Sequence, residues 1–148
     1  DDLDVFIAHD FFANFMLDND GTGSFIDAAS DLGVDSAFNE MGVAVGDCDN
    51  DGDFDLYVSN LYGSQGGDQE HNVFFTKSNT DAGYTEDAVA LGVDNGGWGW
   101  GTVFLDFDND GGQRDRVWGR RCALETLDES RPDGWDSGIH RTRGRDRV

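Results

Sequence analysis

The stretch that decides the fold is a nine-residue acidic loop with the sequence Asp47-Cys48-Asp49-Asn50-Asp51-Gly52-Asp53-Phe54-Asp55. Aspartate occupies its first, third, fifth, seventh and ninth positions, and glycine occupies the sixth. Oxygen ligands at every second residue let a short loop wrap a hard cation of the calcium type. The glycine permits the sharp turn, because only glycine adopts positive φ without steric cost. The pattern therefore predicts a Ca²⁺ site.

Five residues of this loop are assigned as metal ligands. Side-chain carboxylates are assigned to Asp47, Asp49, Asp51 and Asp55, and a backbone carbonyl is assigned to Asp53. Without a cation, two carboxylates about 4 Å apart repel each other by roughly 4 kcal/mol at an effective dielectric constant near 20. A divalent cation would reverse the sign of that interaction. The alternative interpretation is a solvated acidic turn between two strands.

The residues around the loop favour strands over helices. An EF-hand loop needs a bidentate glutamate at its twelfth position, and here that position is Val58. The segments 41–46 and 56–59 on either side are short, rich in β-branched and aromatic residues, and bounded by glycine and aspartate. The sequence therefore predicts a strand, an ion loop and a second strand.

Composition limits the possible functions. The chain has 148 residues, enough for one domain with a core, and a formal net charge of −21. Such a charge repels phosphates and anionic lipids, so nucleic-acid binding and membrane-surface binding are disfavoured. Aromatic residues make up 12% of the chain, which argues against disorder. No apolar run is long enough for membrane insertion, and two cysteines make no disulfide framework.

The chain also repeats itself. Residues 27–35 recur as residues 86–94, and residues 47–52 recur as residues 106–111, both at an offset of 59. We therefore expect a first repeat unit at 1–46, a second unit with the calcium loop and the start of a third at 47–111, and a non-repeat basic tail at 112–148. Each unit contains four strand-like pieces. The predicted strands are Asp4–Ala8, Phe12–Leu17, Ser24–Ala28, Met41–Gly46, Leu56–Ser59, Val73–Lys77, Tyr84–Asp87 and Trp98–Leu105.

Shorter elements are predicted between these strands. Residues 19–23, Asn-Asp-Gly-Thr-Gly, predict a hairpin turn, with another ion site at Asp18 and Asp20 as the alternative. A single helical turn is expected at residues 28–33. In the eighth strand, Trp98, Trp100, Thr102 and Phe104 share one face by strand alternation, and glycines occupy the other. We interpret that tryptophan face as core, with an aromatic platform for a sugar as the alternative.

The repeat resembles the FG-GAP/VCBS family. The stretch from Gly46 to Val58 and the sequence Trp98-Gly99-Trp100-Gly101 are similar to its cartilage-acidic-protein and UnbV-like branch. The resemblance covers residues 1 to about 111. It implies an all-β fold, here about two four-stranded antiparallel blades of a β-propeller of the integrin α-subunit kind. It also implies that the acidic loop binds calcium and stiffens the blade, in a secreted, periplasmic or cell-surface parent protein.

A second, weaker calcium site is predicted at Asp106, Asp108 and Asp110. The ninth position of that loop is Arg114, whose guanidinium repels a dication and offers no lone pair. Charge changes abruptly at the same place. Residues 1–113 hold 24 acidic residues and one lysine, whereas residues 114–148 hold seven acidic residues and nine arginines.

We expect the tail after Gly112 to be irregular, with a helical turn or two at 123–129. The change of composition falls inside the second ion loop, whereas natural boundaries lie in linkers. A shifted reading frame near Gly112 explains both the broken loop and the gain of arginine. The alternatives are a genuine cap and a basic nucleic-acid tail, but the tail has few aromatic residues and no recognition motif.

Three classes of function are compared. An enzyme is disfavoured because His9, His71 and His140 stand apart and no nucleophile has a recognisable setting; a polysaccharide hydrolase or lyase is kept as the alternative. A calcium-stiffened scaffold that binds a protein or glycan through loops such as 61–70 fits the sequence. A purely structural array is the third possibility.

Overall fold

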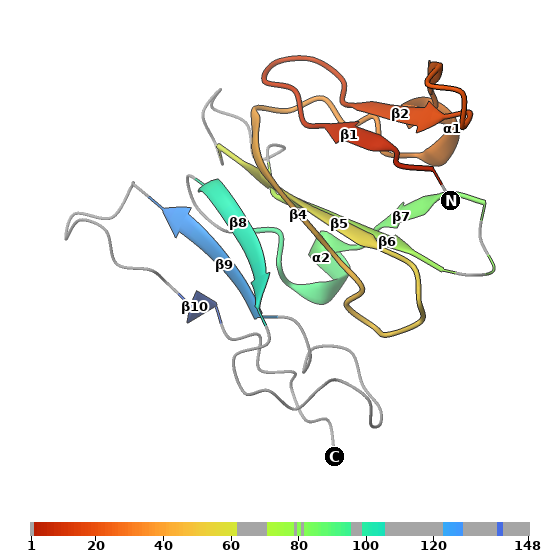
Figure 1. The fold of residues 1–148 in the computed structure, drawn as a ribbon. Helices are drawn as coiled ribbons and strands as arrows, with labels where there is room; N and C mark the ends of the chain where they lie inside the picture. The colour runs from red at the N-terminus through yellow and green to blue at the C-terminus, as the bar shows by residue number, and fades with distance from the viewer. Residues whose placement is uncertain are drawn as a thin grey trace.

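The computed structural model is built mainly of β-strands, which confirms the all-β prediction (Figure 1). It describes residues 2–61, 71–78, 80, 82–95, 99–105, 123–128 and 139–140, and for Leu105 and the strands after it only the backbone is described. The elements are β1 (Val5–Ile7), β2 (Phe15–Asn19), β3 (Phe25–Asp27), α1 (Ala29–Leu32), β4 (Glu40–Gly46), β5 (Asp55–Asn60), β6 (Val73–Lys77), β7 (Tyr84–Glu86), α2 (Ala88–Leu91), β8 (Gly99–Leu105), β9 (Ala123–Asp128) and β10 (Ile139–His140).

The strands form three antiparallel sheets, and in each sheet strands that follow one another along the chain are paired. Their orders are β1-β2-β3, β4-β5-β6-β7 and β10-β9-β8. The four-stranded sheet lies between the other two, because β4 and β5 contact β8 on one side while residues of β1 and β2 pack against its core on the other (Figure 1). No sheet closes into a barrel among the described strands, and the arrangement is consistent with partial blades of a propeller.

The sequence repeat appears as repeated structure. A hairpin pair of strands is followed in each copy by a third strand and by one helical turn, α1 or α2. Both turns end at a glycine in the left-handed conformation, Gly33 with φ 74° and Gly92 with φ 70°. The predicted helical turn at residues 28–33 is therefore confirmed. The predicted hairpin turn at 19–23 is confirmed as well, because the Asp20 N–H donates to the Ser24 carbonyl at 3.1 Å.

The sheets are grouped differently from the four strand-like pieces expected in each unit. Strand β4 was expected to close the first unit, but it pairs with β5 across the acidic loop, with Gly46 opposite Asp55. Consecutive strands joined by a short loop pair readily in antiparallel fashion, and that local pairing sets the grouping. The acidic loop therefore connects two neighbouring strands of the central sheet. The repeat units 1–46 and 47–111 describe a period of the sequence and stay a prediction.

Part of the tail is ordered into strands, contrary to expectation. The helical turn expected at 123–129 is wrong, because Ala123–Asp128 forms β9 and pairs antiparallel with β8. Strand β10 then pairs with β9. The unpaired backbone groups along the edge of β8 offer a ladder of hydrogen bonds, which outweighs the weak local helix preference. The other residues after 105 lie outside the described part of the chain, and the reading-frame hypothesis stays untested.

The central sheet has an apolar cluster on each face. On one face, Phe75 of β6 contacts Phe6 of β1 edge to face, with 6.5 Å between ring centroids. On the other face, Phe74 lies 6.0 Å from Phe104 of β8. The first cluster comprises Ala29, Val34, Leu56, Val58, Val73 and Phe75, and the second comprises Ala44, Tyr57, Phe74 and Ala88. The central sheet, which carries the acidic loop at its β4–β5 connection, is therefore packed on both faces.

Strands β4 and β8 approach each other through glycine. A Cβ added to Gly42 would lie 3.0 Å from the Gly101 Cα and 3.0 Å from the Trp100 carbonyl oxygen. A Cβ on Gly46 would lie 2.8 Å from the Phe104 ring. Glycines in β4 therefore let it pack closely against β8, at the backbone of Trp100 and Gly101 and at the ring of Phe104.

We expect Gly42→Ala to lower the free energy of unfolding by about 1–3 kcal/mol, because the added methyl group overpacks the contact between β4 and β8. Chemical denaturation with matched slopes measures the change. A gain in stability would contradict the prediction, since alanine alone reduces the entropy of the unfolded chain and would stabilise a site with room for it.

Candidate metal centre

The acidic loop connects β4 to β5 and turns the chain through two left-handed residues. Asn50 has φ 61° and Gly52 has φ 98°. Asparagine tolerates this conformation better than most residues, and glycine adopts it without cost. The predicted role of glycine at the sixth position is thus observed in the backbone. The two left-handed residues fold the loop back so that its acidic side chains face one another.

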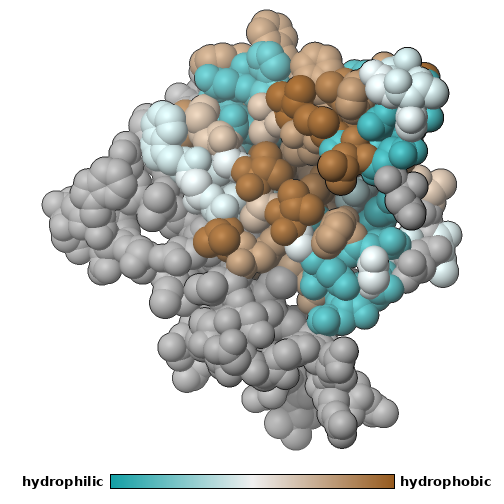
Figure 2. Space-filling model, in the orientation of Figure 1, coloured by the Kyte–Doolittle hydropathy of each residue, from teal (hydrophilic) through white to brown (hydrophobic). Residues whose placement is uncertain are grey.

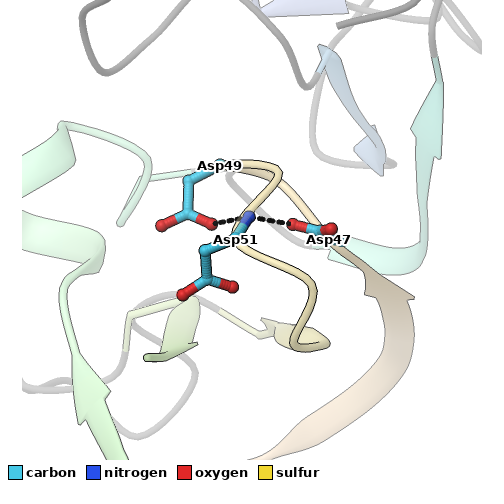
Figure 3. Close-up of side chains that lie close together, drawn as sticks. All are labelled: Asp47, Asp49 and Asp51. Carbon is cyan, nitrogen blue, oxygen red and sulfur yellow. Dashed lines mark hydrogen bonds between the residues drawn. The ribbon is translucent and has the colours of Figure 1, made fainter. Parts of the chain in front are cut away.

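The loop's own backbone orients its carboxylates. The Asp51 N–H donates to Asp47 Oδ1 and to Asp49 Oδ1, each at 3.1 Å (Figure 3). The Gly52 N–H donates to Asp47 Oδ2 at 3.1 Å, and the Asp53 N–H donates to Asp51 Oδ1 at 3.0 Å. Each bond uses one lone pair of an oxygen that carries two. The carboxylates are therefore held in place with acceptor capacity left over.

Three carboxylates converge on one point. Ligand oxygens of Asp47, Asp49 and Asp51 all lie within 4.8 Å of one another, and this is the one such acidic, cysteine or histidine group within the described residues. Oxygen ligands of Ca²⁺ lie 2.3–2.6 Å from the ion, so two of them can be at most about 5 Å apart. The spacing and the all-oxygen donor set therefore allow this cluster to hold a metal ion.

The electrostatics of the loop also favour a cation. Burial raises the pKa of Asp49, and repulsion from the Asp51 and Asp47 carboxylates raises it further, against a lowering by the Asp51 backbone hydrogen bond. The cluster therefore carries partly desolvated negative charge, and neighbouring carboxylates in it raise the pKa of Asp49. A bound dication would compensate that charge.

Asp55 anchors the end of the loop. Its side chain is buried, with 2% exposed. Oδ2 accepts the Cys48 N–H and Oδ1 accepts the Lys77 N–H of β6, both at 2.9 Å. Burial raises its pKa, the two backbone hydrogen bonds lower it, and the charges of Asp49 and Asp51 raise it. Asp55 thus ties the start of the loop to the neighbouring strand.

The structure brings together part of the predicted ligand set. Asp47, Asp49 and Asp51 form the cluster, whereas Asp55 stands beside it as an anchor. Asp53 was assigned through its backbone carbonyl, which the side-chain cluster does not test. The second loop, with Asp106, Asp108 and Asp110, lies outside the described residues, and so does most of the loop 61–70.

The tryptophan face shows a mixed outcome. Phe104 packs against the cluster of Ala44, Tyr57, Phe74 and Ala88, as a core residue should. Trp100 is 46% exposed, so the core interpretation is wrong for this ring. Trp98 lies outside the described residues.

Sequence reasoning missed a repeated buried asparagine. The Asn14 N–H donates to the Ser36 carbonyl and the equivalent Asn72 N–H donates to the Asp94 carbonyl. Their Oδ1 atoms accept backbone N–H groups of His9 and Asn60. The recurrence of asparagine at the start of β2 and β6 was the available signal. The backbone N–H of each asparagine joins its strand to the connection after the helical turn, and its side-chain oxygen binds the chain at the end of the preceding strand.

Comparison with known proteins gives one informative match. Cartilage acidic protein 1 of Xenopus tropicalis is 38% identical over 61 residues. The match covers 40% of this chain and 9% of that protein, so the chain corresponds to a small part of its relative. No family model matches.

Proposed function

We propose that this chain is a calcium-binding module from an extracellular β-propeller of the FG-GAP/VCBS kind. The convergence of Asp47, Asp49 and Asp51 within 4.8 Å carries this proposal. A loop that already orients three carboxylates loses little entropy when the ion binds. The ion would cross-link the loop that connects β4 to β5 and would thereby stiffen the central sheet. The partial similarity to an acidic protein of cartilage supports the same assignment.

The exposed face of the first sheet supports membership of a larger array. Val5 and Ile7 are 42% and 41% exposed, whereas Leu56 and Val58, their equivalents in the repeat, are buried. Apolar residues also gather in the middle of the face shown in Figure 2. Repeat units bury such faces against their neighbours. A further sheet of the same kind would cover Val5 and Ile7 as the first sheet covers Leu56 and Val58.

The surroundings of the loop support an extracellular setting. Cys48 is disulfide-bonded, and disulfides persist in oxidising compartments such as the periplasm and the cell exterior. Within the described residues, no helix is long and apolar enough to cross a membrane. In this proposal the module is a rigid, non-enzymatic scaffold whose loops bind a protein or a glycan in adhesion.

The histidines give the enzyme alternative little support. The His9 ring lies 5.2 Å from the Phe12 ring and its Nδ1 is 2.7 Å from the Asp10 carbonyl oxygen. His71 packs against Phe38 and faces Glu86 at 4.0 Å. Both imidazoles are held by structural contacts. Turnover of polysaccharides by the purified protein would overturn the non-enzymatic assignment.

We expect Ca²⁺ to raise the melting temperature of this chain relative to excess chelator. An ion that binds the folded state alone contributes about 2.7 kcal/mol at a hundred times its Kd. Extracellular calcium modules have Kd values of order 10⁻⁴–10⁻³ M, so Ca²⁺ should be scanned from about 0.1 mM to about 100 mM. Scanning calorimetry with and without Ca²⁺ measures the shift.

A matched pair of double variants assigns the shift to the loop. Asp49→Ala with Asp51→Ala should abolish the response to Ca²⁺, because alanine offers no ligand oxygen. Asp31→Ala with Asp35→Ala removes the same number of carboxylates from exposed positions outside the loop and should leave the response intact. Equal melting temperatures of the unmodified protein in Ca²⁺ and in chelator would refute the metal assignment.

A further inference from the structure

A buried glutamate occupies the junction between the first two sheets. Glu40 begins β4, pairs with Asn60 at the end of β5, and is 3% exposed. The Ser36 hydroxyl donates to Glu40 Oε1 at 2.5 Å, and Asn14, directly before β2 of the first sheet, donates from Nδ2 to the Ser36 Oγ at 3.1 Å. A short chain of hydrogen bonds therefore runs from the first sheet through Ser36 to Glu40.

The remaining oxygen of Glu40 has no hydrogen-bond partner, and neither does the side-chain oxygen of Asn60, the residue opposite Glu40 in the β4–β5 pair. Both Glu40 Oε2 and Asn60 Oδ1 are buried without one. The Asn60 amide is oriented by its Nδ2, which donates to the His71 carbonyl at 2.7 Å, so its oxygen points elsewhere. Directly opposed residues of an antiparallel pair project from the same face, with Cβ atoms about 5 Å apart. Two acceptors therefore occupy neighbouring buried positions.

Ionised glutamate cannot resolve this arrangement, because a carboxylate only accepts hydrogen bonds. A protonated carboxyl group carries one O–H donor and can donate to an amide oxygen. Leaving a buried polar atom without a partner costs about 1–3 kcal/mol, so a proton that satisfies two acceptors at once is favoured. The neutral acid is thus the form of Glu40 that fits this site.

We propose that Glu40 is a proton-controlled link between the first two sheets. In its neutral form, Oε2–H donates to Asn60 Oδ1 while Oε1 accepts the Ser36 hydroxyl. Ionisation removes the donor, leaves the carboxylate and the amide oxygen facing each other, and weakens the junction.

The surroundings of Glu40 support this assignment. Its pKa is raised to about 7 by burial, while the neighbouring polar side chains of Ser36 and Asn14 act to lower it. The titratable side chains described on the elements around it are Asp10 and His9 before β2, Asp35 before β4, and His71 and Glu86 beside the start of β6. None of these charges is among the causes of the shift. The pKa of Glu40 is therefore set by burial and by its polar neighbours Ser36 and Asn14.

The pH dependence follows from the direction of the shift. A carboxyl group with a raised pKa binds its proton more tightly in the folded state than in the unfolded chain. Its stabilising contribution is complete below about pH 4.5, the ordinary value, and is lost as the pH rises through about 7. The junction should therefore loosen between these limits.

Hydrogen exchange across the junction tests the link directly. The Phe11 N–H donates to the Phe38 carbonyl and the Asn14 N–H donates to the Ser36 carbonyl, both across the junction. With chelator held constant and intrinsic exchange rates corrected for pH, we expect exchange at these two amides to accelerate by roughly tenfold to a hundredfold between pH 5 and pH 8. The Val93 amide, which donates to the Ala88 carbonyl at the end of α2, serves as the internal reference.

Glu40→Gln should remove this pH dependence, because the glutamine Nε2 donates to Asn60 Oδ1 at every pH. Glu86→Gln makes the same charge change near the surface and should leave the acceleration unchanged. If Glu40→Gln fails to fold, carbon-13 NMR of the unmodified protein gives the titration of the Glu40 carboxyl group. A midpoint near 7 supports the link, and a midpoint near 4.5 or an unchanged acceleration in Glu40→Gln overturns it.

Discussion

Phe75→Ala should lower the free energy of unfolding by about 3–5 kcal/mol, the range for removing a buried phenylalanine side chain. Phe75 is 2% exposed and lies in the cluster where the first sheet meets the central one. Its ring contacts Phe6 of β1, so truncation removes packing within the sheet and between the sheets together. Urea denaturation, followed by tryptophan fluorescence, measures the loss.

Phe54→Ala is the matched control. Phe54 is 66% exposed and lies in the acidic loop, so the same truncation should change stability by less than about 0.5 kcal/mol. A domain is typically stable by only about 5–15 kcal/mol, so Phe75→Ala can unfold the chain outright. Phe75→Leu, which leaves a smaller cavity, then provides a measurable intermediate loss. Equal effects of Phe75→Ala and Phe54→Ala would show that the two sheets do not share a core.

The strands could be predicted from the sequence because their local patterns are strong. Val73–Lys77 is bounded as expected, and most other strands differ from their predicted bounds by one or two residues. The exception is β2, which was expected from Phe12 and begins at Phe15. Phe11 has φ 76°, a conformation that ends extended structure, and Asn14 is buried in the turn that follows. Apolar residues in an irregular connection cannot be told from a strand by composition alone.

Strand partnership was harder to predict than strand position. A repeat fixes the spacing of equivalent residues but leaves open which strand begins a sheet. In the structure β4 pairs with β5, with Gly46 opposite Asp55, and β9 pairs with the edge of β8. The first is pairing across a short loop and the second is a tertiary contact, and neither follows from the strand propensity of single residues.

The acidic loop could be predicted further than the rest of the site. The alternating aspartates and the glycine at the sixth position predicted the convergence of Asp47, Asp49 and Asp51. Nothing in the same pattern indicated that Asp55 would be buried and bonded to the Lys77 N–H, because that contact depends on β6 lying beside β5. The burial of Glu40 and its hydrogen bond to Ser36 likewise depend on tertiary packing.

Asp55 therefore combines two roles that the sequence treats as one. As the ninth residue of the loop it is a predicted ligand, and as the first residue of β5 it accepts two backbone N–H groups. The structural role exists without any ion, whereas the ligand role contributes when Ca²⁺ is present. Measurements with chelator and with Ca²⁺ separate the two contributions.

Asp55→Ala should lower the free energy of unfolding by about 2–4 kcal/mol in chelator, because the Cys48 and Lys77 N–H groups each lose an acceptor in a partly buried setting. Asp53→Ala, which keeps the backbone carbonyl assigned as a ligand, should change stability little and retain the response to Ca²⁺. If Asp55 is also a ligand, Asp55→Ala will lose stability in chelator and will further lose most of the Ca²⁺ stabilisation. Full stability of Asp55→Ala in chelator would contradict the anchoring role, since the two N–H groups would then have no need of the carboxylate.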